Sequence, residues 1–157
     1  MTNSFDKIIM FLAMGFYSGK SPFAPGTAGT IVGLPLCWLL AQMKLTYAIT
    51  TIIIVTILAI PISGRAEKIA GTKDPGFIVI DEIAGIMITF IAIPFTPLSA
   101  LAGFFLFRGF DVIKPFPVGM LDKKLSGGTG IVLDDVAAGI MANLVLQCAV
   151  YFGVIVN

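Results

Sequence analysis

The sequence predicts an all-α fold: a polytopic integral membrane protein, built as a compact bundle of about four to six short helices. Composition is the first reason, because 57% of the residues are apolar and 12% are charged, whereas soluble proteins carry about 25% charged residues. The mean hydropathy of +1.01 agrees with this reading. A chain of 157 residues is expected to form one membrane-embedded domain, residues 1–157.

Five apolar runs mark the expected helices, at residues 8–17, 29–43, 45–62, 83–107 and 136–156. The 45–62 run approaches the ~20 residues that a helix needs to cross a ~30 Å hydrocarbon core. The 29–43 run is shorter, about 22 Å of helix. Only Lys44 separates these two runs, which predicts a tight helical hairpin. The 8–17 run is too short to assign to a spanning helix.

Two prolines, Pro94 and Pro97, interrupt the 83–107 run. Proline inside a helix removes a hydrogen bond, and the residue before a proline disfavours helical geometry. We therefore expect two short antiparallel helices, at about 80–93 and 98–109, joined by a turn.

This turn decides which charged residues share one side of the membrane. With it, Arg108 lies on the same side as Asp81 and Glu82, whereas a single straight helix would separate them. The basic residues that then gather on that side are Lys20, Arg65, Lys68, Lys73, Arg108, Lys114, Lys123 and Lys124. Because basic residues collect on the cytoplasmic side of membrane proteins, we expect the loops that form the site to face the cytoplasm.

Two acidic doublets stand out in a chain with nine acidic residues. Asp81-Glu82 opens one apolar run, and Asp134-Asp135 lies inside another; each doublet is followed by a Gly-Ile-Met triplet. An ionisable group at a membrane segment costs several kcal/mol unless it is paired or metal-bound, so it marks a functional site. We expect the four carboxylates to form one divalent-cation site from two halves. The alternative is that acids in a first helical turn only complement the helix dipole.

Missing residue types narrow the chemistry. The sequence has no histidine, which removes Ser–His–Asp catalysis, histidine-bound zinc and a phosphohistidine route. Neither Cys37 nor Cys148 has an arginine six positions on, and both are expected as buried small side chains rather than a disulfide. Carboxylate oxygens remain, and they suit Mg²⁺ or Mn²⁺.

Two polar segments supply candidate phosphate ligands. The glycine-rich stretch from Gly15 to Thr30 precedes a helix, whose first amides and dipole favour an anion; a glycine-proline turn is the alternative. Its candidate substrate ligands are Lys20, Ser21, Thr27 and Thr30. In the second segment Arg108, Asp111 and Lys114 recur every three residues, so a continuing helix would align them on one face. That alignment would also fit a simple salt-bridge ladder.

Taken in order, these segments resemble the phosphatidylglycerophosphatase A family over roughly residues 10–142. The motifs that carry the resemblance are Gly19-Lys-Ser-Pro-Phe-Ala-Pro-Gly-Thr-Ala-Gly-Thr30, Asp81-Glu82-x-x-Gly85, Phe107-Arg108-x-x-Asp111-x-x-Lys114-Pro-x-Pro117 and Gly127-Gly-x-Gly-Ile-x-x-Asp134-Asp135. One departure is the absence of histidine from residues 64–80, which puts a catalytic role for that loop in doubt.

The resemblance implies a Mg²⁺-dependent phosphatase of the bacterial cytoplasmic membrane. It would hydrolyse the terminal phosphomonoester of phosphatidylglycerophosphate, giving phosphatidylglycerol and phosphate, with no nucleic-acid partner and no obligate protein partner. The expected catalytic residues are Asp81, Glu82, Asp111, Asp134 and Asp135, and the expected Mg²⁺ ligands are Asp81, Glu82, Asp134 and Asp135. Lys20, Ser21, Thr27, Thr30, Arg108 and Lys114 are expected to bind substrate. Water attack and an aspartyl-phosphate intermediate both remain open.

Two other functions remain open from the sequence. The chain could act on another lipid or isoprenoid phosphate, because the motifs supply ligands only for the phosphate group. It could also be a small divalent-cation transporter, since transporters place charges at mid-membrane where helices are interrupted. The position of the acids at helix entrances, beside phosphate-type loops, favours the enzyme.

Overall fold

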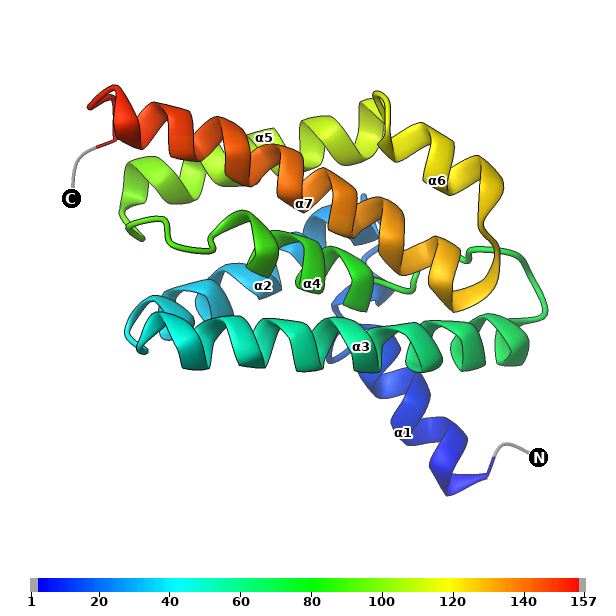
Figure 1. Ribbon diagram of the computed structural model, residues 1–157. Helices are drawn as coiled ribbons and strands as arrows, with labels where there is room; N and C mark the ends of the chain where they lie inside the picture. The colour runs from blue at the N-terminus through cyan, green and yellow to red at the C-terminus, as the bar shows by residue number, and fades with distance from the viewer. Residues whose placement is uncertain (1–2, 156–157) are drawn as a thin grey trace.

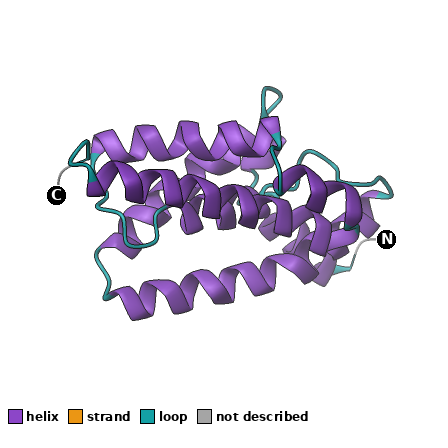
Figure 2. Ribbon diagram, turned by 45° about the horizontal axis from the view of Figure 1, so that its top comes forward, coloured by secondary structure: helices purple, strands orange, loops and turns teal. Residues whose placement is uncertain are grey.

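The computed structural model describes residues 3–155, and over that range it is all-helical. The elements are α1 (Ser4–Ala13), the 3₁₀ turn η1 (Ser18–Lys20), α2 (Pro25–Ala41), α3 (Leu45–Ala70), α4 (Ile80–Thr89), α5 (Pro97–Ile113), α6 (Val118–Lys124) and α7 (Gly127–Tyr151). The long helices run side by side with most loops gathered at the two ends (Figures 1 and 2). The all-α prediction is confirmed, but residues 3–155 form seven α-helices rather than four to six, because the short helix α6 forms between α5 and α7.

Helix α4 is the centre of the bundle (Figure 1). Eight of its ten residues are buried, and α2, α3, α5 and α7 all pack against it. A helix that is apolar on every side is stable only when it is surrounded. This burial brings the first turn of α4, with Asp81 and Glu82, into contact with the other helices at one end of the bundle.

Two helices within residues 3–155 are long enough and apolar enough to cross a membrane, α3 and α7. Their exposure differs, because only 17% of the most apolar window of α3 is buried, against 50% for α7. The outer face of α3 carries Ile53, Ile54, Ile57 and Leu58, each more than half exposed. Such a continuous apolar face is costly in water and suits a lipid environment.

Both of these helices differ from their predicted limits. Helix α3 continues past residue 62 to Ala70 and ends at Gly71, whose positive φ closes the helix. Helix α7 begins at Gly127, so the expected start near 136 was wrong. This early turn packs closely on α3, because a side chain at Gly128 would lie 1.9 Å from the Ile60 carbonyl oxygen. Glycine there lets α7 pack directly on α3.

The predicted turn between α4 and α5 is confirmed. Helix α4 ends at Thr89, and α5 starts at Pro97 behind a capping box in which Thr96 and Ser99 bond each other's backbone amides. Helix α5 then returns along the bundle, so that Arg108 lies 3.9 Å from Glu82.

Helix α4 ends inside the bundle, and two amide side chains of α7 satisfy its last carbonyls. Asn143 donates to the carbonyl oxygens of Thr89 and Ile91, both at 2.9 Å, and Gln147 donates to Ile91 at 3.1 Å. Non-helical backbone at membrane depth is tolerated only when its polar groups have partners of this kind.

We expect Asn143→Leu to destabilise the fold by about 1–3 kcal/mol, because it leaves the buried Thr89 carbonyl without its side-chain donor and removes one of the two donors to Ile91. Thermal unfolding in detergent would measure this. The matched control is Gln42→Leu, which removes an exposed amide from the surface of α2. Equal melting temperatures for the two variants would contradict a role for Asn143 in holding the end of α4.

Candidate active site

Three carboxylates from two helices converge at one end of the bundle. Asp81 and Glu82 come from the first turn of α4, and Asp135 comes from α7. One oxygen of each lies within 4.8 Å of the others. We call these three residues the carboxylate triad. It unites the two acidic doublets, as the sequence predicted, but with three members rather than four.

A glycine contact between α4 and α7 sets this geometry. A Cβ at Gly139 would lie 2.4 Å from the carbonyl oxygen of Gly85, so the two helices touch backbone to backbone. Each glycine follows its acidic doublet by three or four residues, about one helical turn. Helix packing therefore explains why the same sequence pattern follows both doublets: the two glycines let α4 and α7 approach and bring Glu82 and Asp135 together.

The triad has acceptor capacity that no residue of the described chain uses. Asp81 Oδ1, Glu82 Oε2 and Asp135 Oδ2 are buried atoms without a hydrogen-bond partner, although buried polar atoms are nearly always paired. Three neighbouring carboxylates, each with an unpartnered oxygen, match the hard-oxygen ligand set of Mg²⁺ or Mn²⁺. The residues present therefore fit a divalent cation.

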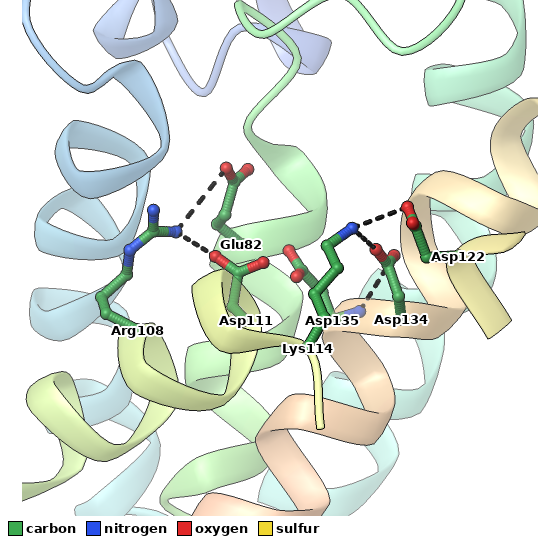
Figure 3. A network of polar contacts seen from close by, with 7 residues as sticks. All are labelled: Glu82, Arg108, Asp111, Lys114, Asp122, Asp134 and Asp135. Atoms are coloured by element: carbon green, nitrogen blue, oxygen red, sulfur yellow. Dashed lines mark hydrogen bonds and ion pairs between the residues drawn. The ribbon is translucent and has the colours of Figure 1, made fainter. Parts of the chain in front are cut away.

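Asp134 lies beside the triad but turns to another partner. Its carboxylate accepts a hydrogen bond from Lys114 Nζ at 2.7 Å, and Lys114 also donates to Asp122 at 2.7 Å (Figure 3). Asp134 therefore lies beside the site, but its carboxylate pairs with the ammonium group of Lys114. It is not one of the three carboxylates with unpartnered oxygens. Asp122 was not predicted, and only its position eight residues after Lys114, on the short helix α6, could have suggested it.

Lys114 is a fixed positive charge. It follows α5 in a left-handed conformation with φ of 49°, which turns it away from the face of that helix. Burial lowers its pKa, but the hydrogen bonds and charges of Asp122 and Asp134 outweigh this effect and raise the pKa above its ordinary value. Lys114 therefore remains protonated at neutral pH and serves as an anion ligand or anchor, not as a proton carrier.

Arg108 and Asp111 form the pair that the three-residue spacing predicted. The Arg108 guanidinium donates to Asp111 Oδ2 and lies 3.9 Å from Glu82 Oε1. Asp111 points toward Asp135, so the pair lies against the triad (Figure 3). The complete ladder does not form, because Lys114 turns to the other carboxylates.

The first turn of α2 packs against Glu82 and Arg108. A Cβ at Gly26 would lie 2.3 Å from Glu82 Oε1 and 3.1 Å from an Arg108 nitrogen, so only glycine allows this approach. The early amides of a helix lack intrahelical partners and favour anions. Thr27 lies in this turn and is half-buried.

The other three residues predicted to bind substrate make contacts elsewhere. Thr30 is fully buried, and its hydroxyl donates to the Gly26 carbonyl oxygen at 2.8 Å, so it supports α2 from within. Lys20 is exposed, with its Nζ 4.4 Å from the centre of the Tyr17 ring. Ser21 donates to the carbonyl oxygen of Phe23 at 2.8 Å. None of these three contacts the triad within the described residues.

Both cysteines are free, as expected, but only Cys37 is buried. Cys148 is exposed on the outer side of α7, which corrects the prediction that both are buried.

We expect Asp122→Asn to lower kcat/KM by up to about fivefold, because it removes one of the two carboxylates that hold Lys114, and a partly exposed ion pair is worth about 1 kcal/mol or less. Phosphate release from lipid micelles, the activity that the resemblance implies, measures the effect. Asp122→Glu should restore part of the loss, since it keeps the charge. A full loss in both variants would show that α6 itself, not this pair, had been disturbed.

The fold and site define a class: a helical protein with an exposed apolar face and a buried carboxylate group that fits a divalent cation beside Arg108 and Lys114. The model of the family described as phosphatidylglycerophosphatase A matches residues 11–150. The chain therefore belongs to the phosphatidylglycerophosphatase A family.

Individual relatives agree with this family. A protein named phosphatidylglycerophosphatase A from Haemophilus influenzae is 40% identical over 149 residues, covering 92% of this chain and 90% of the relative. Its namesake from Escherichia coli is 34% identical over 132 residues, covering 83% and 77%. A Bacteroides thetaiotaomicron protein, provisionally named a phosphatidylinositol-3-phosphatase, is 34% identical over 148 residues, covering 89% and 92%. No solved structure matches the chain significantly.

Proposed function

We propose that this chain is a Mg²⁺-dependent phosphatidylglycerophosphatase of the bacterial inner membrane, with its site facing the cytoplasm. It would hydrolyse the terminal phosphomonoester of phosphatidylglycerophosphate and release phosphatidylglycerol. Family membership supports the reaction. The observation that carries the proposal is the carboxylate triad with its unpartnered oxygens, packed against a guanidinium and a fixed lysine cation.

In this proposal the acidic side chains bind the metal ion and the basic side chains bind the phosphate. Asp81, Glu82 and Asp135 would hold Mg²⁺, which when bound supplies positive charge to the phosphate and lowers the pKa of water. Arg108 can present two N–H groups to two phosphate oxygens, and Asp111 holds its guanidinium in position. Lys114 supplies a second positive charge, held between Asp122 and Asp134. Fixed cations of this kind stabilise the charge that develops on a transferring phosphoryl group.

The proposed location follows from the same arrangement. The exposed apolar face of α3 suits lipid, and the substrate carries its phosphate at the membrane surface. The turn at residues 94–97 lies at the opposite end of α5 from Arg108, so a cytoplasmic site would place this turn outside. An impermeant thiol reagent on intact cells tests this with single cysteines at positions 96 and 120; equal labelling of both would contradict it.

Phosphate release by purified protein tests the reaction. We expect the highest kcat/KM with phosphatidylglycerophosphate, lower values with phosphatidylinositol 3-phosphate and an isoprenoid phosphate, and no release after chelation of Mg²⁺. The Bacteroides relative makes the inositol lipid the relevant competitor. A clear preference for another lipid phosphate would overturn the substrate assignment. Metal uptake into liposomes without phosphate release would identify a transporter.

We expect Arg108→Lys to lower kcat/KM by about tenfold to a hundredfold, because lysine keeps the charge but cannot form two parallel hydrogen bonds to a phosphate. Arg65→Lys is the matched control, since Arg65 pairs with Asp6 at the surface through a similar contact. Lys114→Arg should lose less than Arg108→Lys. If Arg108→Lys retained full activity, the guanidinium would have no geometric role in phosphate binding.

A further inference from the structure

A cavity lies away from the triad, toward the end of the bundle where α2 and α3 meet. It has a volume of about 390 Å³ and lies between the C-terminal half of α2, the N-terminal half of α3 and the end of α4. Cys37 and Leu40 of α2, Ala48 and Ile52 of α3, and Met87 and Phe90 of α4 are among its lining residues. In Figure 1 these ends of the three helices lie together at the left, whereas α4 starts nearer the middle.

The lining determines the chemistry of the occupant. Every side chain that lines the cavity is apolar, including those of the irregular segment from Ile91 to Pro94. Of the backbone carbonyls here, those of Thr89 and Ile91 accept hydrogen bonds from Asn143 and Gln147 of α7, and that of Pro94 accepts one from Ser99. No charged or polar side chain of the described residues lines the cavity, so a polar ligand would find no side-chain partner. A hydrocarbon chain needs none.

The position of the cavity relative to the triad matches the length of a lipid tail. Helix α4 joins the two features, and from Glu82 to Phe90 it advances eight residues, about 12 Å. Helix α2 also joins them, and from Gly26 to Leu40 it advances fourteen residues, about 21 Å. One leaflet of a bilayer is about 15 Å of hydrocarbon. An acyl chain of a lipid whose phosphate lies at the triad therefore reaches this depth.

We propose that this cavity binds the methyl-terminal part of one acyl chain of the lipid substrate. The inference rests on the proposed function, because it takes the phosphate to be held at the triad. An acyl chain gains little free energy from the hydrophobic effect when it moves from the bilayer hydrocarbon into an apolar cavity. The preference arises instead from closer packing on several sides, and from the bound head group, which confines the chain end near the cavity.

Photochemical cross-linking tests this directly. The probe is phosphatidylglycerophosphate with a diazirine at the end of one acyl chain, mixed with the protein and Mg²⁺ in detergent, frozen rapidly and irradiated. We expect cross-links on Met43, Ile52 and Met87, which line the cavity, in clear excess over Ile53 and Ile57, which lie on the exposed face of α3. Equal labelling of the two groups would overturn the proposal.

Variants and a second lipid sharpen the result. Ala48→Phe and Ala41→Phe both project bulk into the cavity, and whichever keeps the wild-type melting temperature should lose the cavity cross-links to the level of Ile53. Ile57→Phe on the exposed face should keep them. Phosphatidylethanolamine with the same diazirine should label the cavity less than the phosphatidylglycerophosphate probe does. Equal labelling by the two lipids, or no loss in the cavity variants, would overturn the assignment to the substrate.

Failure of this proposal can be told from failure of the proposed function. If the wild-type protein releases phosphate but the cross-links spread evenly over α3, only the cavity assignment is wrong. If the protein releases no phosphate from the lipid, the proposed function fails first, and with it the premise of the cavity assignment.

Discussion

Neutralising any member of the carboxylate triad should abolish most activity without unfolding the protein. Asp81→Asn, Glu82→Gln and Asp135→Asn each remove one buried charge and keep the shape of the side chain. Loss of a metal ligand costs several kcal/mol of transition-state stabilisation, about a hundredfold or more in rate. Stability should stay equal or rise, because three buried carboxylates with unpartnered oxygens repel one another. Phosphate release and thermal unfolding measure the two effects.

A readout that does not depend on turnover is the response of stability to Mg²⁺. A ligand that binds only the folded state raises the melting temperature, so Mg²⁺ should stabilise the wild-type protein and should stabilise the triad variants much less. Asp134→Asn is the informative comparison: it should lose activity, because Lys114 loses a partner, yet keep most of the Mg²⁺ response. Asp6→Asn, at the surface pair with Arg65, is the control. Two triad variants with wild-type turnover at saturating Mg²⁺ would refute the site.

Gly139→Ala should damage both the stability of the fold and the geometry of the site. Its methyl group would lie 2.4 Å from the Gly85 carbonyl oxygen, which belongs to backbone and cannot rotate away. Helices α4 and α7 would have to separate, at a cost of about 1–3 kcal/mol in stability. The same movement would shift Asp135 relative to Glu82, and a displacement of about 1 Å in a catalytic group can cost a hundredfold in rate.

Gly109→Ala is the matched control, because Gly109 lies in α5 and a Cβ there meets nothing within 4 Å. Alanine at an open helical position should leave stability unchanged or raise it by about 0.4–1 kcal/mol. Melting temperature and kcat should therefore fall for Gly139→Ala and stay constant for Gly109→Ala. Similar behaviour of the two variants would mean that the contact between the helices does not set the site.

Local sequence signals predicted the turn between α4 and α5 and the meeting of the two acidic doublets. Proline at positions 94 and 97 restricts the backbone whatever the surroundings, and apolar runs with acids at membrane depth require a common partner. These signals act within a few residues, so they can be read without the fold. The polytopic membrane arrangement stays a prediction, since length and hydropathy alone support it here.

Features that depend on long-range packing could not be predicted in this way. Helix α7 begins at Gly127, and its first turn packs on α3 through Gly128, which lies against the Ile60 carbonyl oxygen; local propensity does not predict this contact. Asp122 pairs with Lys114 only because α6 folds back toward the site. Thr30 resembles a phosphate ligand in sequence, but its position on α2 turns it into the core. In each case a partner distant in sequence decides the role.

The amide side chains of Asn143 and Gln147 have a consequence for biosynthesis. They lie on α7, which is synthesised after α4, α5 and α6, yet they satisfy carbonyls at the end of α4. Until α7 is synthesised, α4 has exposed carbonyls and no Asp135 beside its acids. The central helix therefore completes its assembly only after α7 has been synthesised, although domains usually begin to fold from the N-terminus during synthesis. A ribosome-bound chain that stops before α7 should remain sensitive to protease at residues 90–96.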